Sequence, residues 1–279
     1  MDLLDAMQSA SSAFGPPSYP EAHGALSSAT ALTPRALQRA GRSGPRSAKS
    51  APHGAVQAPA VQLGGPLPSH GARFVAIAGN IGAGKSTLTA FLASRFGIQP
   101  FYEPNDSNPY LTDFYADMGQ YAFHSQVYFL SAKFRAHLGL ARLLDEQPKA
   151  VFVQDRTIYE DAEIFAKTLH TRGVLPDRDH LTYDSLYAGI RDALPRPDLL
   201  IYLRCSLRGL KRRIRARGRP EEQAMDPTYL SDLQDAYESW IDRYDLSPKL
   251  VIETERLDYL SHLCDRLDLE KALGDLLPK

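Results

Sequence analysis

A glycine-rich run near residue 80 contains the residue types that bind phosphate. Nine residues form it: Gly79, Asn80, Ile81, Gly82, Ala83, Gly84, Lys85, Ser86 and Thr87. They match the pattern G-x-x-x-x-G-K-[ST], in which glycines let the backbone turn tightly and direct several N–H groups at an anion. The Lys85 ammonium can then reach the β- and γ-phosphates, and the Ser86 hydroxyl can ligate Mg²⁺. The run predicts a site for a nucleoside triphosphate.

The residues on either side of this run predict the strand and the helix that a phosphate loop needs. Before it, Phe74–Ala78 is short and apolar, as in a buried strand. After it, Leu88, Phe91 and Leu92 follow the i, i+3, i+4 spacing of an amphipathic helix, whose first turn adds unpaired N–H groups. The glycines do not fall as G-x-G-x-x-G, so this is not a dinucleotide-binding fingerprint.

Further apolar runs predict a parallel sheet. Short strands are expected near residues 98–102, 150–154, 199–203 and 250–253, with helical patterns between them. This alternation indicates an α/β fold, a P-loop three-layer sandwich with a five-stranded parallel sheet flanked by helices. In such a sheet, ligands bind beyond the carboxyl ends of the strands. Glu103, Asp155 and Arg156 all follow strand ends, so we expect them to meet the phosphate loop.

These three charged residues have the chemistry that a phosphate cradle lacks. Glu103 is placed to take a proton from an attacking hydroxyl, although an acid before proline is also a common turn residue. Asp155 resembles the Walker-B acid that holds Mg²⁺ directly or through water. Arg156 is suited to clamping the transferred phosphate, or to pairing with Glu103.

Residues 204–219 form a second, basic cluster. On a helix, Arg208, Lys211, Arg212 and Arg215 are expected to be solvated. Three of the other arginines approach Gly218 and the expected helix end: Arg213, Arg217 and Arg219. An arginine-rich segment that closes over phosphates neutralises the charge that builds on a transferring group. A nucleic-acid patch is the alternative interpretation.

A long helical pattern runs from about residue 119 to residue 144. Its expected buried stripe consists of Tyr121, Val127, Leu130, Phe134, Leu138 and Ala141. Gln126 lies on the same helix, where the pattern alone assigns it a solvated position.

Composition divides the chain into a tail and one domain. Residues 1–72 contain 15 Ala, 10 Ser, 9 Pro and 8 Gly, and only two aromatic residues, Phe14 and Tyr19. Such a segment buries too little apolar surface to offset its ordering entropy, so we expect a disordered N-terminal extension over 1–72 and a folded domain over 73–279. A transit peptide is the alternative, but Asp2 and Asp5 argue against organellar targeting.

The net charge, the length of the apolar runs and the two cysteines limit the kinds of partner and the cellular location that we expect. The net charge is −1, which does not favour general binding of a nucleic acid polymer. No apolar run approaches the ~18 residues of a membrane span. Cys205 and Cys264 lack metal-ligand spacing and suit a reducing cytosol, so we expect a cytoplasmic protein.

Several motifs, in this order, resemble the deoxynucleoside kinase family, in particular its bacterial deoxyadenosine/deoxyguanosine kinase type. They are GNIGAGKST, Tyr102-Glu103-Pro104, Asn108-Pro109-Tyr110-Leu111, Gln126, the run QDRTIYEDAEIFA from Gln154, and RARGRPEE from Arg215. The resemblance covers about three quarters of the chain, from Arg73 to the C-terminus. It is specific because the motifs occur together.

The resemblance implies roles for the residues at the strand ends. Glu103 matches the general base that deprotonates the nucleoside 5′-hydroxyl. Asp155-Arg156-Thr157 matches the family's Asp/Glu-Arg-Ser triplet, with the acid near Mg²⁺ and the arginine near the 5′-oxygen. Thr157 stands where serine is usual, which is a mild change.

The resemblance also implies contacts with the sugar and the base. Tyr115 and Glu222 match the pair that holds the 3′-hydroxyl, and Gln126 matches a base-reading residue whose amide offers a donor and an acceptor. Asp161 matches the second base-reading position, where an acid fits a base with an amino group and argues against thymidine. Lys133 falls where several relatives place an arginine that pairs with this acid, which leaves the base preference open.

The function implied is phosphorylation of a deoxynucleoside at its 5′-hydroxyl by ATP with Mg²⁺ as cofactor, with deoxyadenosine favoured and deoxyguanosine or deoxycytidine as alternatives. Arg213, Arg217 and Arg219 match the family's lid over ATP, and the resemblance implies a homodimer. Two other functions remain open: a thymidylate-type nucleoside monophosphate kinase, and a non-catalytic ATP-binding switch protein.

Overall fold

The computed structural model describes residues 61–64, 71–102, 107–223, 225–255 and 263–274. Within these ranges six strands form one sheet in the order β1-β6-β5-β2-β4-β3. The strands are β1 (Val61–Gly64), β2 (Phe74–Ala78), β3 (Gln99–Phe101), β4 (Phe152–Asp155), β5 (Leu199–Arg204) and β6 (Lys249–Glu253). The strands β2 to β6 pair in parallel, which confirms the predicted five-stranded parallel sheet of a P-loop sandwich.

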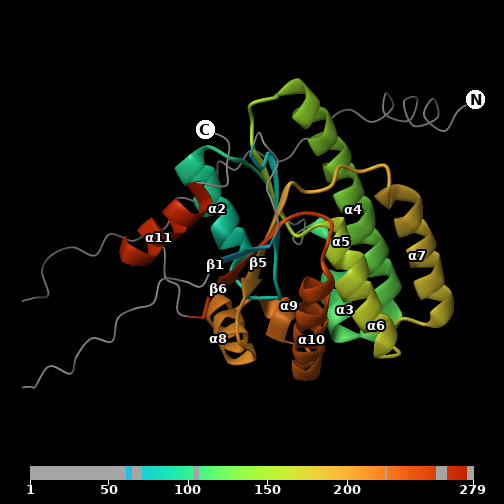
Figure 1. Cartoon of the computed structure of the whole chain (residues 1–279). Coiled ribbons are helices and arrows are strands. Elements are labelled where there is room, and N and C mark those ends of the chain that lie inside the picture. The colour runs from blue at the N-terminus through green and yellow to red at the C-terminus, as the bar shows by residue number, and fades with distance from the viewer. Residues whose placement is uncertain (1–60, 65–70, 103–106, 224, 256–262, 275–279) are drawn as a thin grey trace, which may run out of the picture. The chain divides into compact units, whose positions relative to one another are not determined.

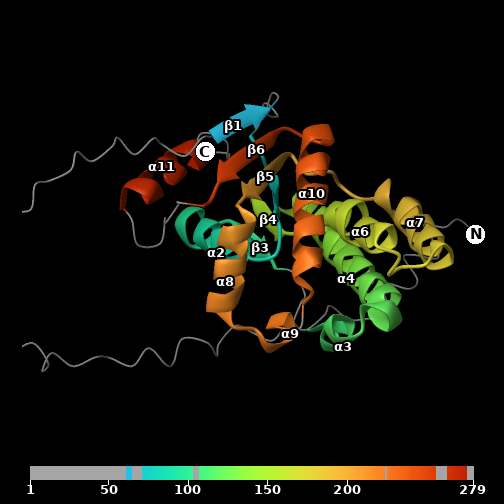
Figure 2. The ribbon, with the colours of Figure 1, turned by 90° about the horizontal axis from the view of Figure 1, so that it is seen from below.

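Helices cover both faces of the sheet. Figures 1 and 2 show α2 and α11 on one face and α4, α6 and α10 on the other, with α7 outside α4. The helical elements are α2 (Lys85–Phe96), α3 (Leu111–Ala116), α4 (Met118–Glu146), α5 (Ile158–Glu160), the π-helix η2 (Asp161–Ala166), α6 (Lys167–Thr171), α7 (Asp177–Arg191), α8 (Leu207–Arg217), α9 (Pro220–Gln223), α10 (Pro227–Arg243) and α11 (Leu263–Gly274). Among the described helices, none is long and apolar enough to cross a membrane.

The central strands are buried on both faces. All five side chains of β2 are buried, as are those of β5 from Leu199 to Leu203. Near-continuous apolar runs are typical of parallel strands covered by helices on both sides. β2 pairs with β4 and β5 so that Ile77 lies opposite Asp155 and Ile201. The last residues of these strands therefore lie at one edge of the sheet.

One strand was not predicted from the sequence. β1 lies within the 1–72 segment assigned to the extension, and it pairs antiparallel with β6, with Val61 opposite Ile252. Composition does not detect such a strand, because pairing with an edge strand uses main-chain groups. Residues 1–60 lie outside the described residues, so the extension's disorder and its boundary at residue 73 stay predictions.

The buried face of α4 differs from the predicted stripe. Its buried residues are Ala122, Ser125, Gln126, Phe129, Leu130, Lys133, His137 and Leu140. Most of the predicted apolar stripe is only half-buried, Leu130 excepted. The hydrophobic pattern fails here because this helix buries polar side chains that have buried partners, such as Lys133 beside Asp161. Gln126 is buried on this helix, so the alternative of a solvated position is wrong.

Candidate active site

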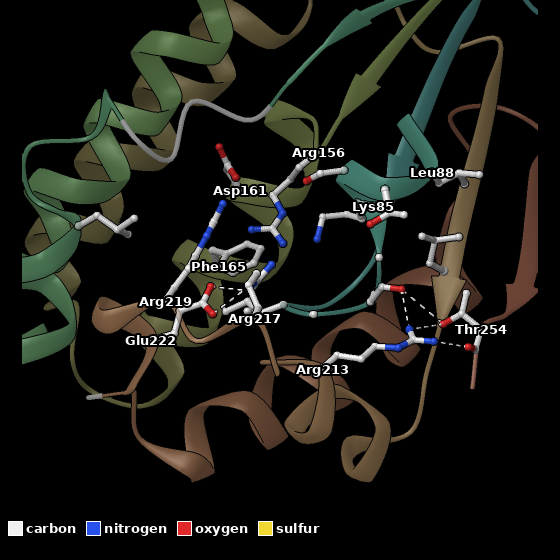
Figure 3. A pocket seen from close by; sticks show the side chains of 18 of the residues that line it. Lys85, Leu88, Arg156, Asp161, Phe165, Arg213, Arg217, Arg219, Glu222 and Thr254 are labelled. Atoms are coloured by element: carbon white, nitrogen blue, oxygen red, sulfur yellow. Dashed lines mark hydrogen bonds and ion pairs between the residues drawn. The ribbon is translucent and has the colours of Figure 1, made fainter. Parts of the chain in front are cut away.

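A cavity of about 380 Å³ opens beyond the carboxyl ends of the central strands. Figure 3 shows Lys85, Arg156 and Arg219 directed into it from different elements. Its lining includes many of the residues predicted from the sequence: Ile81, Gly82, Ala83, Gly84, Lys85, Ser86, Thr87, Tyr115, Gln126, Arg156, Asp161, Arg213, Arg217, Arg219 and Glu222. Residues that are far apart in the chain therefore share one cavity.

The phosphate loop joins β2 to α2. Gly79 and Gly82 have φ angles of +151° and +82°, which L side chains rarely adopt. A Cβ at Gly79 would lie 2.9 Å from the Leu203 carbonyl oxygen of β5, so the loop also needs glycine for space. The loop ends at the first turn of α2, where Lys85 Nζ donates a hydrogen bond to the Asn80 carbonyl at 3.2 Å. A loop of this shape presents backbone N–H groups and one ammonium to an anion.

Ser86 and Asp155 place two oxygen atoms side by side next to the loop. The Ser86 hydroxyl donates to Asp155 Oδ2 at 2.6 Å, although Asp155 itself does not line the cavity. A hydroxyl and a carboxylate are hard oxygen ligands of the kind that Mg²⁺ prefers, and Mg²⁺ usually takes its other ligands from water and substrate phosphates. These two residues fit a magnesium ion bound together with a nucleotide.

Arg156 lies in a turn that bends its side chain back over the phosphate loop. It is the one non-glycine residue among those described that has a positive φ, at 61°. Its Nη2 donates to the Gly79 carbonyl at 3.3 Å, and its guanidinium lies over the Phe165 ring, 4.3 Å from the centroid. The cation is therefore held beside the loop and lines the cavity.

The far end of the cavity is formed by α4 and the π-helix η2. Gln126 of α4 and Asp161 of η2 are both buried, at 3% exposure each, and both line the cavity. Lys133 Nζ lies 2.5 Å from Asp161 Oδ1 in a buried ion pair. The π-helical turn widens the helix at Asp161, a deviation that is frequent at functional sites.

The three predicted lid arginines have different surroundings. Arg213 donates to the Ala83 carbonyl at 2.9 Å and to Thr254 Oγ1 at 3.0 Å, and Figure 3 shows its side chain turned toward Thr254. Arg217 forms an ion pair with Glu222 at 2.6 Å. Arg219 points into the cavity (Figure 3). Arg213 is therefore bound to the backbone of the phosphate loop and to the residue that follows β6.

Comparisons with known proteins identify the family. The family model for deoxynucleoside kinases matches residues 75–277. The chain belongs to the deoxynucleoside kinase family. It is 38% identical over 189 residues to a deoxyadenosine/deoxycytidine kinase of Bacillus subtilis, which covers 67% of this chain and 85% of that protein. It is 38% identical over 200 residues to a deoxyguanosine kinase of Lactobacillus acidophilus, covering 69% and 85%.

A solved structure of a deoxynucleoside kinase has the same fold. The deoxyadenosine kinase of M. mycoides, with the products dCMP and dCDP bound, matches with a TM-score of 0.61 and 31% identity, covering 73% of this chain and 98% of that one. This confirms that the chain is a kinase of the family that the sequence motifs resemble.

Some predicted residues of this deoxynucleoside kinase lie away from the cavity. Gly79 does not line it, and Asn80 turns toward α10, where its Nδ2 donates to the Leu230 carbonyl and to Gln234 Oε1. Glu103, the predicted base, lies outside the described residues. The last described residue before it is Tyr102. Partial burial and the charge of Asp155 raise the pKa of the Tyr102 phenol. Strand β3 thus leads to the same edge of the sheet as β4.

Sequence reasoning missed the apolar wall of the kinase cavity. This wall includes Leu111, Phe114, Phe129, Phe165 and Tyr229. Burial raises the pKa of the Tyr229 phenol, which therefore stays neutral. Single aromatic residues on helices have no distinctive spacing, so the sequence did not separate them from the core.

Two polar residues near the cavity were also missed. Thr254, which lines it, directly follows β6, and the rule about carboxyl ends of strands predicts such a position. Glu160 begins a buried network behind the phosphate loop, and the spacing Thr157-x-x-Glu160 is that of a capping box.

Proposed function

We propose that this enzyme transfers the γ-phosphate of ATP to the 5′-hydroxyl of a deoxynucleoside in nucleotide salvage, with deoxyadenosine as the preferred acceptor and deoxyguanosine or deoxycytidine as alternatives. One observation carries the proposal: Lys85 and Arg156, which suit phosphates, share a cavity with Gln126 and Asp161, which suit a base. A kinase for a nucleoside needs both kinds of site within the length of one nucleotide.

Hydrogen-bond chemistry supports acceptors whose base has an exocyclic amino group. The Gln126 amide offers a donor and an acceptor side by side, and an ionised Asp161 only accepts. Adenine, cytosine and guanine have an amino group to donate, whereas thymine has none. The two relatives described above are named for deoxyadenosine, deoxycytidine and deoxyguanosine, which agrees with this chemistry.

The mechanism is mainly positioning and charge neutralisation. Lys85, the backbone of the phosphate loop and the lid arginines Arg217 and Arg219 would hold ATP, and Arg156 would orient the transferring phosphate. Ser86 and Asp155 would hold Mg²⁺, which neutralises phosphate charge when bound. We propose Glu103 as the general base for the 5′-hydroxyl and assign Tyr115 and Glu222 to the 3′-hydroxyl, on the sequence motifs that they share with the family.

A substrate panel tests the activity. The four deoxynucleosides and their monophosphates are incubated with ATP and Mg²⁺, and ADP release is measured. We expect turnover of deoxyadenosine, deoxyguanosine or deoxycytidine, and little of thymidine. Phosphorylation of monophosphates alone would favour the thymidylate-type alternative, and nucleotide binding without any turnover would favour the switch protein. Membership of the deoxynucleoside kinase family favours the nucleoside as acceptor.

The base is tested by Glu103→Gln. The change keeps the size of the side chain and removes its proton affinity, so kcat should fall by about 10²-fold or more. The affinity for ATP should stay within about threefold of wild type, because phosphate binding does not use this carboxylate. Glu146→Gln, an exposed change at the end of α4, is the matched control. Wild-type turnover by Glu103→Gln would remove Glu103 from the mechanism.

We also infer a homodimer formed through α4 and α7. Leu181 and Leu186 of α7 are 67% and 46% exposed, and α7 packs against α4, whose predicted apolar stripe is mostly half-buried. Leu181→Glu combined with Leu186→Glu should convert the dimer into a monomer in analytical ultracentrifugation. A wild-type monomer at micromolar concentration would contradict the inference.

The buried free thiol of Cys205 agrees with the proposed cytoplasmic location.

A further inference from the structure

Glu160 is a fully buried carboxylate behind the phosphate loop. It is 0% exposed, lies in α5 four residues after Arg156, and does not line the cavity. Its oxygens accept three hydrogen bonds: from the Thr157 N–H at 3.0 Å, the Gly79 N–H at 3.3 Å and the Tyr237 hydroxyl at 2.9 Å. The donors belong to the turn after β4, the phosphate loop and α10. One side chain therefore connects three elements around the site.

Both polar groups of Gly79 are bound by residues that follow β4: Arg156 in the turn and Glu160 at the end of α5. The Gly79 N–H donates to Glu160, and the Gly79 carbonyl accepts from Arg156 Nη2. On its other side, Gly79 lies too close to the Leu203 carbonyl to admit a side chain. The first residue of the phosphate loop is thus held between β5 and these two residues, and its position depends on Arg156 and Glu160.

The same turn contains the strained residue Arg156. A left-handed conformation is unfavourable for a non-glycine residue, and it persists only where the surrounding structure enforces it. Here the capping box between Thr157 and Glu160 fixes the residues that follow Arg156. Glu160 Oε1 also lies 3.9 Å from Arg156 Nε, so its charge faces the guanidinium directly. Removing the carboxylate would free both the turn and the cation.

We propose that Glu160 is a positioning residue for phosphoryl transfer, which holds the phosphate loop and Arg156 in register with each other. This rests on the proposed function, in which Arg156 acts on the transferring phosphate. Glu160 acts through its neighbours, because it has no surface in the cavity. Its loss should lower the rate of phosphate transfer and leave recognition of the base, at the other end of the cavity, unchanged.

Two opposing influences set the pKa of Glu160. Burial raises its pKa to about 7, and the nearby charges of Arg156, Lys85 and Lys133 oppose that rise. The ionised carboxylate accepts from all three partners, two of which are backbone N–H groups that can only donate.

Glu160→Gln tests the proposal by steady-state kinetics and thermal unfolding. The amide replaces one acceptor oxygen with a donor, which then opposes a backbone N–H. We expect kcat to fall about 100-fold, the effect of a small misplacement of reacting groups, with KM for the deoxynucleoside within about threefold of wild type. Glu160→Asp keeps the charge but is one methylene shorter, so it cannot reach all three donors. We expect it to lose about tenfold in kcat. If Glu160→Gln does not fold, the kcat of Glu160→Asp tests the positioning role of Glu160.

Leu140→Ala is the matched control for stability. Leu140 is fully buried in α4 beside Phe74 and Phe152, away from the cavity. It should lower Tm as much as Glu160→Gln or more, while kcat stays within about threefold of wild type. A Glu160→Gln or Glu160→Asp enzyme with wild-type kcat, or a kcat that falls equally in Leu140→Ala, would overturn the role of Glu160 alone. If the wild type phosphorylates no deoxynucleoside, the proposed function fails and the inference fails with it.

Discussion

The two ends of the cavity are built in different ways. The phosphate end consists of the loop Gly79–Thr87 with Arg156, and its shape comes from the main chain: glycines with positive φ, and a carbonyl and an N–H of Gly79 that bind the neighbouring turn. The base end consists of Gln126, Lys133 and Asp161, and its polar groups are side chains on two helices. There, a cation and an anion neutralise each other inside the protein.

The two ends therefore differ in what a charged side chain contributes. It contributes to ligand binding at the phosphate end and to the stability of the fold at the base end. At the phosphate end, Lys85 donates a hydrogen bond to the Asn80 carbonyl and its side chain lines the cavity, where a bound phosphate would meet its charge. At the base end, the charge of Lys133 faces Asp161 at 2.5 Å. Removing one partner of a buried pair leaves an uncompensated charge, which is costly to the fold. Charge removal should therefore cost turnover at one end and stability at the other.

The largest expected effect is that of Lys85→Met on turnover. The change keeps the length of the side chain and removes the cation that would face the phosphates. We expect kcat with ATP and the preferred deoxynucleoside to fall by about 10³-fold, with the free energy of unfolding changed by less than about 1 kcal/mol. Lys149→Met, at an exposed position, is the control. A decrease in kcat of less than tenfold would contradict the expected role of the Lys85 charge at the phosphate end.

Lys133→Met tests the base end by urea unfolding. It leaves the Asp161 carboxylate buried without this cation, so the free energy of unfolding should fall by about 3–5 kcal/mol. Adding Asp161→Leu removes the remaining charge and should restore most of the lost stability, because an apolar pair of similar volume often replaces a buried ion pair without loss. If the single variant lost less than about 1 kcal/mol, the pair would not be a structural element.

The smallest effect concerns His137, next to Lys133 on α4. Burial and, to a smaller extent, the charge of Lys133 lower its pKa to about 4. Between pH 6.5 and 4 the unfolded chain binds a proton at this residue and the folded chain does not, so stability decreases as the pH falls through this range. His137→Phe should remove about 2 kcal/mol of the stability difference between pH 7.5 and pH 5.

The contribution of His137 is obtained from the difference in unfolding free energy between wild type and His137→Phe. Glu160 has a raised pKa, so its folded form binds a proton first, and its contribution to stability has the opposite sign between about pH 7 and pH 4.5. Urea unfolding of wild type and His137→Phe at both pH values cancels this contribution. Parallel pH profiles for the two proteins would show that His137 does not titrate as its burial requires.

The same contrast explains what the sequence predicted. The phosphate end was predictable because one short motif fixes glycine, lysine and serine at set spacings on a strand, a turn and a helix, and β2 and α2 begin where expected. Asp155 and Arg156 followed from the rule on strand ends. Each of these inferences uses the main chain, and its geometry is local or follows directly from parallel pairing.

The base end was harder to predict from residues alone. The apolar pattern of α4 indicated the wrong buried face, because Gln126, Lys133 and His137 are buried by partners that lie far away in the sequence. The π-helical turn that sets Asp161 has no spacing rule of its own. The family resemblance identified Gln126 and Asp161 as site residues, whereas the hydrophobic periodicity of the helix did not. Glu160 was missed for a related reason. Its capping box with Thr157 is local, but its other two donors, Gly79 and Tyr237, lie 81 and 77 residues away in the sequence.

The pairing of β1 with β6 has a practical consequence for anyone shortening this chain. A protein that starts at residue 73, where composition places the boundary, would lack Val61–Gly64 and leave the outer main-chain groups of β6 bare. An uncovered edge of this kind is a template for other chains, so the shortened enzyme would be prone to aggregate. Expression from residue 58 or earlier retains the cover.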